Sequence, residues 1–292
     1  MKTYFIRHAS ELDIDKATIH KLHKEGIIAI HYPWAKDNPS KETDSNSLNP
    51  DHYNRSGKSA LRTLLDISKN GGYICAEYRG LNPLIGYVEP NTPIELFEGV
   101  WGSKNKREGR IAILKSLKLA KYSEIDPVNY VSLSVARPRQ GTLVRWPSVK
   151  KRIESIVNGK KISRSLEDLT PDQQETMCAE FLRFNNVEGS YFSKLETLLL
   201  PVGRTMKDID IAGISESDKK ILAQVTFGKI EDYKHKVDRL KKFKNSQDTE
   251  LILFCRCDAP KFEDGIVVFP IQQVFKEFAA SEQGQRWLNA IT

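Results

Sequence analysis

The sequence is poor in cysteine, and the few cysteines it has are not spaced as pairs. The four residues are Cys75, Cys178, Cys255 and Cys257, with no Cys-x-x-Cys motif among them. This spacing excludes a disulfide framework and a zinc finger. Buried free thiols are therefore expected, as in proteins of a reducing cytosol.

Long hydrophobic runs are also missing. No apolar stretch approaches the ~18 residues that a membrane-spanning helix requires. The apolar tripeptide at residues 4–6 is followed by charge, so no signal peptide is expected. The sequence thus predicts a soluble, cytoplasmic protein with no membrane partner.

The chain does contain enough apolar residues for a core and a small excess of basic residues. Its 292 residues are 39% hydrophobic, and this length predicts about two domains. Lys and Arg number 45 against 38 Asp and Glu, with a pI near 9.0. This balance points mildly to a polyanionic partner.

Composition divides the chain into three parts. Residues 1–148 are mixed and β-rich, residues 149–168 form a basic junction, and residues 169–292 alternate strand and helix signals. Such alternation predicts a central mixed sheet flanked by helices, so the expected fold class is α/β, or α+β over the whole chain. We also expect a strand over residues 130–135 and a helix over residues 192–200.

The segment YFIRHAS at residues 4–10 places Arg7-His8 at the end of an apolar run, which resembles the start of the histidine phosphatases. That resemblance implies that His8 accepts a phosphoryl group and that a late histidine helps to bind it. The late histidine here, His235, lies on a lysine-rich helix, and Ala9 replaces the usual glycine. These departures favour a plain strand end whose Arg7 or His8 faces solvent or a groove.

Two other short motifs are incomplete. The segment RSGKS at residues 55–59 ends like a P-loop, but the opening glycine would fall at His52 and the upstream run is polar. The backbone nest that holds phosphate is therefore not expected. The pair His20-x-x-His23 has no third metal ligand nearby in sequence, which favours solvent-facing histidines.

Residues 202–229 carry the pattern with the most chemical content. With the period of two that a strand imposes, Asp208 and Asp210 share one face, while Ile209 and Ile211 share the other and enter the core.

The following strand adds two polar side chains, Gln224 and Thr226, on one face. A short hairpin would bring them beside the two aspartates. Such oxygen ligands suit a hard cation such as Mg²⁺, which can polarise a phosphodiester and activate water. A solvated sheet face is the alternative that the residues leave open.

These residues resemble the core of the PD-(D/E)XK nuclease superfamily. Within that superfamily they are most similar to the Mrr-like restriction endonucleases. The family pattern is an acid on a first helix, then a strand-end Asp, then Gln-x-Lys. Here Asp210 and Gln224 match, and the helix acid is Glu175 or Glu180.

Over residues 170–290 this resemblance implies a restriction-endonuclease-like sheet and an endonuclease of restriction or phage-defence type that uses Mg²⁺ or Mn²⁺. The metal ligands implied are Asp210, Gln224 and Asp208. The catalytic set implied is Glu175, Glu180, Asp210, Gln224 and Thr226.

One position departs from the family pattern. The motif lysine, which orients water and stabilises the developing charge, falls at Thr226. Lys229, Lys234 and Lys236 follow closely, the last two on a basic helix expected over residues 231–242, and are candidates for a relocated lysine or for phosphate contacts. The alternative is a nuclease-like domain that binds nucleic acid without cutting it.

The first half more weakly resembles PUA-like modules, including EVE-type domains. The carrying segments are GIIAI at residues 26–30, GYICA at 72–76 and LIGYV at 84–88. The resemblance implies a small β-barrel that holds a flipped, modified base in an aromatic pocket. The candidate walls are Tyr32, Trp34, Tyr78, Tyr87 and Trp101, and core packing is the alternative for each.

The basic segment supplies further candidates for phosphate contacts. These are Arg137, Arg139, Arg145, Lys150, Lys151 and Arg152. The partner implied is DNA, modified or not. The resemblance also allows a homodimer and partner defence proteins, and a solvated linker is the alternative for the segment.

Overall fold

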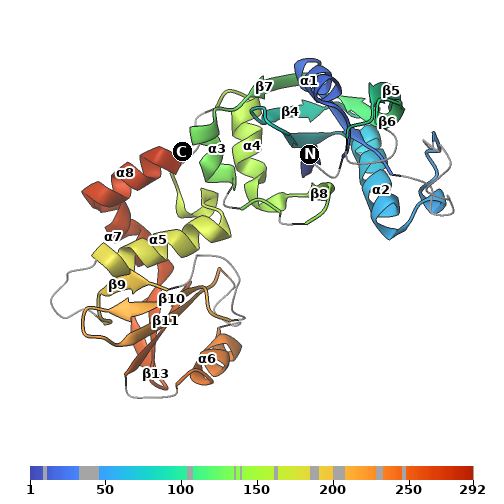
Figure 1. The fold of residues 1–292 in the computed structure, drawn as a ribbon. Helices are drawn as coiled ribbons and strands as arrows, with labels where there is room; N and C mark the ends of the chain where they lie inside the picture. Colours follow the sequence, from blue (N-terminus) through green and yellow to red (C-terminus); the bar gives the residue numbers. More distant parts are fainter. Residues whose placement is uncertain are drawn as a thin grey trace. The chain divides into compact units, whose positions relative to one another are not determined.

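The computed structural model describes residues 1–8, 12–32, 46–103, 108–134, 136–138, 140–160, 164–184, 191–199, 208–227, 233–244 and 248–291. The chain forms two compact units, Met1–Ser163 and Arg164–Thr292 (Figure 1). Within the described ranges, no helix is both long and apolar enough to cross a membrane.

The first unit contains two sheets and several helices. Its strands are β1 (Thr3–His8), β2 (Ile27–Ile30), β3 (Gly72–Tyr78), β4 (Leu84–Val88), β5 (Glu95–Val100), β6 (Ile111–Lys118), β7 (Lys121–Glu124) and β8 (Leu143–Arg145). Its α-helices are α1 (Lys16–Lys24), α2 (Arg55–Asn70), α3 (Pro127–Ser134) and α4 (Lys150–Val157), with short 3₁₀ turns at Pro50–His52 and Pro147–Val149.

Alternation along β1 divides the core of this unit between two faces. Tyr4 and Ile6 pack in the cluster that also contains the apolar face of α2, whereas Phe5 packs in the cluster that contains the apolar face of α4. The larger sheet has the order β7-β4-β3-β1-β8, and β1 and β3 are parallel. The segment predicted as a basic junction therefore contributes α4, whose Ile153 and Val157 are buried in this unit.

The PUA-like β-barrel expected for this half is wrong. In the described part of the chain none of the three sheets closes, because one ends at β7 and β8, a second ends at β2 and β5, and the third belongs to the second unit. The strand expected at residues 130–135 is also wrong. Pro127 opens helix α3 there, and the Tyr130 N–H donates to the Asp126 carbonyl at 2.8 Å.

The second unit is a mixed sheet with helices on both faces. Its strands are β9 (Leu195–Leu198), β10 (Ile211–Ser215), β11 (Lys220–Val225), β12 (Thr249–Cys255), β13 (Lys261–Glu263) and β14 (Ile266–Pro270). Its helices are α5 (Pro171–Phe184), α6 (Lys234–Lys241), α7 (Ile271–Ala280) and α8 (Glu282–Ile291), with a 3₁₀ turn at Leu166–Asp168.

Strand order in this sheet is β13-β14-β12-β11-β10-β9. Strand β10 is antiparallel to both of its neighbours, β9 and β11, while β12 is parallel to both β11 and β14. Ile252 and Phe254 of β12 pack with α5, α7 and α8, and Leu251 and Leu253 pack with α6 on the other face (Figure 1). The α+β class and the flanked mixed sheet predicted from the sequence are thus confirmed.

The helix predicted at residues 192–200 is wrong. These residues include β9, which pairs with β10 through Gly213↔Leu198 and Ile214↔Thr197. Leucine and glutamate favour a helix in isolation, but pairing with the edge of the sheet overrides that preference.

Gly213 of β10 lies tightly against β9. A Cβ at this position would lie 2.3 Å from Leu195 Cδ1 and 2.4 Å from the Thr197 carbonyl oxygen. We expect Gly213→Ala to lower the free energy of unfolding of the second unit by about 1–3 kcal/mol, because the backbone oxygen cannot move aside. Urea denaturation measures this, and an unchanged midpoint would contradict the close approach.

Candidate functional site

The helix α5 begins with a reciprocal cap. The Gln173 N–H donates to Thr170 Oγ1 at 3.3 Å, and the Thr170 N–H donates to Gln173 Oε1 at 2.9 Å. This capping box fixes the first turn and therefore the direction of the side chains that follow. Glu175 and Cys178, three residues apart, lie on neighbouring positions of one helix face.

Asp210 lies where β10 begins and is held by the backbone of β11. Its N–H donates to the Ala223 carbonyl at 2.9 Å, and its Oδ2 accepts from the Val225 N–H at 2.8 Å. The regular register of the hairpin ends at Ile211↔Ala223, and the Asp210 N–H bonds to the Ala223 carbonyl one residue off that register. The Asp210 carboxylate therefore lies at the end of β11 that carries Gln224.

Cys178 connects the helix to this end of the hairpin. Its thiol is buried, and burial raises its pKa well above the usual value. The carboxylates of Glu175 and Asp210 raise that pKa further through their charge. Both acids therefore act electrostatically on the same buried thiol. Sequence reasoning treated Cys178 only as a buried thiol, although its spacing of three from Glu175 was a usable signal.

Gln224 supplies a polar atom that the fold leaves unsatisfied. The residue is 6% exposed, and among the described residues its buried Oε1 has no hydrogen-bond partner. A buried acceptor of this kind costs about 1–3 kcal/mol. We call Glu175, Asp210 and Gln224 the Asp210 site.

The donor atoms of the Asp210 site fit a hard divalent cation. Two carboxylates and one amide oxygen match the ligand preference of Mg²⁺ or Mn²⁺, and a cation would satisfy the buried Oε1. Of the described residues, no three His, Cys, Asp or Glu side chains form a group that could hold a metal. A cation here would therefore depend on Gln224 as well as on the two acids.

Asp208 does not lie on the Asp210 face. Its φ is +70°, and its Oδ1 accepts from Arg239 of α6 at 2.8 Å. The Asp210 N–H bonds to the Ala223 carbonyl one residue off the Ile211↔Ala223 register, so the period of two is interrupted between Ile209 and Ile211. Ile209 packs on the α6 face and Ile211 on the α5 face, contrary to the prediction that they share one.

The second helix acid also points elsewhere. Glu180 is five residues from Glu175, about 140° around the helix, and its Oε1 lies 3.5 Å from Arg183. Thr226 follows β11, with its side chain 7% exposed and its N–H donating to the Phe254 carbonyl at 2.9 Å. A buried hydroxyl thus occupies the position of the motif lysine.

The candidate replacement lysines are only partly placed. Lys229 lies outside the described residues. Lys234 and Lys236 both lie on α6, where Lys234 is exposed and Lys236 is partly buried.

The basic candidates of the first unit are dispersed. Arg137 Nη1 donates to Glu77 Oε1 at 2.8 Å, Lys150 and Lys151 are exposed on α4, and Arg145 is exposed on β8. Arg152 is 1% exposed and packs beside Ile153, so its predicted role as a surface phosphate contact is wrong. Arg139 lies outside the described residues.

The aromatic candidates do not form one cage. Tyr78 is 3% exposed in the core that contains α2, and its hydroxyl donates to the Ile27 carbonyl at 2.7 Å. Tyr87 lies on the opposite face of the same sheet. Trp101 packs against His31, with ring centroids 4.6 Å apart, and Tyr32 packs against the α2 core. Trp34 lies outside the described residues.

His8 is a buried structural residue. Its Nε2 accepts from the Ala29 N–H at 3.0 Å, which leaves Nδ1 as donor to the Glu77 carbonyl at 3.0 Å. Burial lowers its pKa to about 4. Its ring stacks on Tyr78 at 4.3 Å. With both nitrogens engaged, His8 is not placed as a phosphoryl acceptor, although it borders a cavity of about 450 Å³.

Comparison with known proteins adds little to this geometry. No known family matches the sequence, and no curated protein matches it. One solved structure, the DNA modification-dependent restriction endonuclease AspBHI, has a TM-score of 0.23 and 10% sequence identity. That comparison covers 91% of this chain and 80% of that one. A similarity this low carries no argument about fold or function.

Proposed function

We propose that the chain is a metal-dependent DNA endonuclease of restriction type whose cation is held by Glu175, Asp210 and Gln224. The observation that carries the proposal is the hydrogen bond from the Val225 N–H to Asp210 Oδ2 at 2.8 Å, which holds this carboxylate at the end of β11 that carries Gln224. This is the order of groups that the resemblance to the PD-(D/E)XK superfamily implies: helix acid, strand-end acid, then amide. DNA as substrate and Mg²⁺ or Mn²⁺ as cofactor belong to this proposal.

The residues of the Asp210 site have distinct tasks in it. The Val225 N–H fixes the orientation of the Asp210 carboxylate, and the two acids supply the negative charge that attracts a cation. Gln224 adds a neutral oxygen from a buried position. A bound divalent cation would polarise a phosphodiester and lower the pKa of a water.

A second function rests on Thr226. A threonine cannot supply the positive charge of the motif lysine, and its side chain is buried. A protein that binds DNA through the nuclease-like unit without cutting it would show this substitution. Such binding would be sensitive to salt and indifferent to Mg²⁺.

Asp210→Asn separates these functions. We expect plasmid or modified phage DNA to be cut with Mg²⁺ or Mn²⁺, not with EDTA, and cutting to be lost in the variant because a ligand charge is removed. Asp218→Asn is the matched control, since Asp218 lies in the turn at the other end of the hairpin, is exposed and has φ +59°. Cutting retained by Asp210→Asn would end the proposal. Binding without cutting in wild type would favour the second function.

A further inference from the structure

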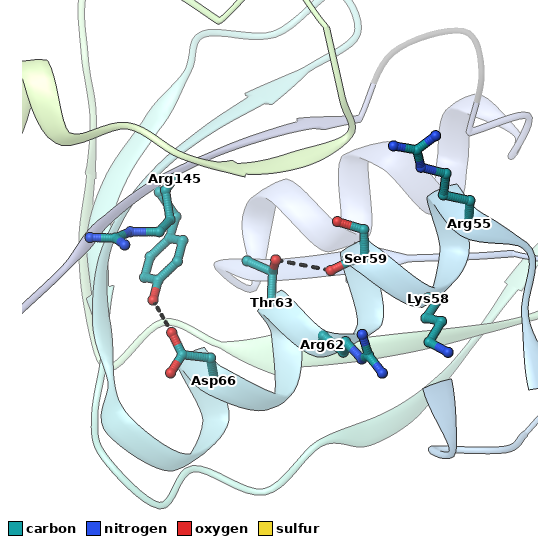
Figure 2. Close-up of a pocket in the computed structure, with 8 residues that line it drawn as sticks. Arg55, Lys58, Ser59, Arg62, Thr63, Asp66 and Arg145 are labelled. Carbon is teal, nitrogen blue, oxygen red and sulfur yellow. Dashed lines mark hydrogen bonds between the residues drawn. The ribbon is translucent and has the colours of Figure 1, made fainter. Parts of the chain in front are cut away.

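A basic groove lies along α2 of the first unit. It encloses about 380 Å³ and is lined by Tyr4, Arg55, Lys58, Ser59, Arg62, Thr63, Asp66 and Arg145 (Figure 2). We call it the α2 groove. The opposite face of the helix is apolar and buried through Leu61, Leu64 and Ile67.

Helical spacing explains the arrangement. Arg55, Lys58 and Arg62 recur at intervals of three and four residues, which places them along one side of α2. Asn54 caps the helix by accepting from the Gly57 N–H at 2.9 Å. Arg145 comes from β8, where it pairs with Tyr4.

The groove carries four cationic side chains and one carboxylate. That carboxylate, Asp66, is already engaged by Lys2 Nζ at 2.8 Å and the Tyr4 hydroxyl at 2.6 Å, and these contacts lower its pKa to about 2. Its charge is therefore largely balanced from outside the groove. Lys58 and Arg62 also approach Asp51, which is exposed and does not line the groove. Exposed pairs of this kind are weak and exchange readily with other anions.

The chemistry of the lining suits phosphate oxygens. The planar guanidinium group of an arginine can donate two hydrogen bonds to one phosphate. The hydroxyl of the exposed Ser59 adds a further donor. From Arg55 to Arg62 the helix rises about 10 Å, which spans roughly three phosphates of one DNA strand. An elongated row of cations fits a backbone better than a single phosphate group.

We propose that the α2 groove binds the phosphate backbone of duplex DNA. The choice of DNA rests on the proposed function, whereas the affinity for phosphate rests on the groove itself. The RSGKS segment would then contact phosphate through its side chains and not through a backbone nest. This surface lies apart in sequence from the Asp210 site, on the first unit.

The test compares two triple variants by fluorescence anisotropy with labelled duplex DNA in EDTA, so that cutting plays no part. The groove variant is Arg55→Ala/Lys58→Ala/Arg62→Ala. The control, Lys16→Ala/Lys24→Ala/Lys69→Ala, removes the same charge from exposed positions of α1 and α2 outside the groove. Alanine is tolerated on exposed helix faces, and circular dichroism checks folding.

We expect the groove variant to bind at least about tenfold more weakly at moderate salt. The slope of log affinity against log salt should become shallower by about 2–3, since three phosphate contacts are lost. The control should stay close to wild type. Equal weakening of both variants, or no weakening, would overturn the proposal, as would an effect seen only with inorganic phosphate or RNA.

The readouts also separate this inference from the proposed function. If the groove variant loses DNA affinity and wild type never cuts DNA, DNA binding by the α2 groove is supported and the nuclease proposal fails. If wild type cuts with metal and the groove variant binds and cuts like wild type, the groove proposal fails alone.

Discussion

Glu175→Gln is expected to lower the rate of metal-dependent cleavage by about three orders of magnitude, because it removes one of two cation-binding carboxylates. Glu180→Gln makes the same change on the same helix and is expected to leave the rate nearly unaltered. The structure provides the reason. Glu175 acts on the buried Cys178 thiol together with Asp210, whereas Glu180 lies about 140° away and pairs with Arg183.

Two measurements check this difference. Plasmid cleavage with Mn²⁺ and with EDTA gives the rates, and calorimetric titration with Mn²⁺ alone gives the affinity for the cation without turnover. Weaker Mn²⁺ binding is expected for Glu175→Gln and not for Glu180→Gln. The reverse pattern would mean that the other face of α5 holds the cation, and the assignment of the Asp210 site would be wrong.

The sequence alone predicted the hairpin of β10 and β11 because hairpin pairing is local. A short turn between two apolar runs determines which residues come opposite. It left Glu175 and Glu180 open because the choice depends on how α5 packs on the sheet. It misplaced Asp208 because the prediction assumed extended strand there, whereas Asp208 lies before β10 with φ +70° and pairs with Arg239 of α6.

Burial was the second source of error. Arg152 was grouped with its basic neighbours, yet it lies on the apolar face of α4 at 1% exposure. Tyr78 and Tyr87 were assigned to one pocket, yet they project from opposite faces of one sheet. Neither fact can be derived from residue type. Both follow from the positions of a helix and a strand in a sheet whose order depends on distant pairings.

The RSGKS segment shows a different error. The missing glycine argued against a backbone nest, but the motif comparison did not use the spacing of Arg55, Lys58 and Arg62. The intervals of three and four residues were visible in the sequence and predict one basic helix face. Only the position of Arg145 on β8 required the structure.

Acidification from neutral pH to about 4 is expected to lower the stability of the first unit by roughly 3 kcal/mol through His8 alone. Burial lowers the pKa of this imidazole from 6.5 to about 4. Between those two pKa values the imidazole is protonated in the unfolded chain but neutral in the folded unit. The contribution of His8 to the free energy of unfolding is therefore complete above pH 6.5 and decreases as the pH drops. The loss levels off once the folded imidazole also protonates.

His8→Gln removes this titration while keeping one acceptor and one donor. We expect it to be less stable than wild type at neutral pH but to lose less stability between pH 6.5 and 4. His20→Gln, at an exposed position of α1, should keep the wild-type slope. Urea unfolding over this pH range measures both variants, and hydrogen exchange of the Ala29 amide, which donates to His8, reports the site directly. If wild type and His8→Gln show the same pH dependence, the His8 ring takes up its proton equally easily in the folded and the unfolded chain. Arg7-His8 would then again be a candidate for phosphate chemistry.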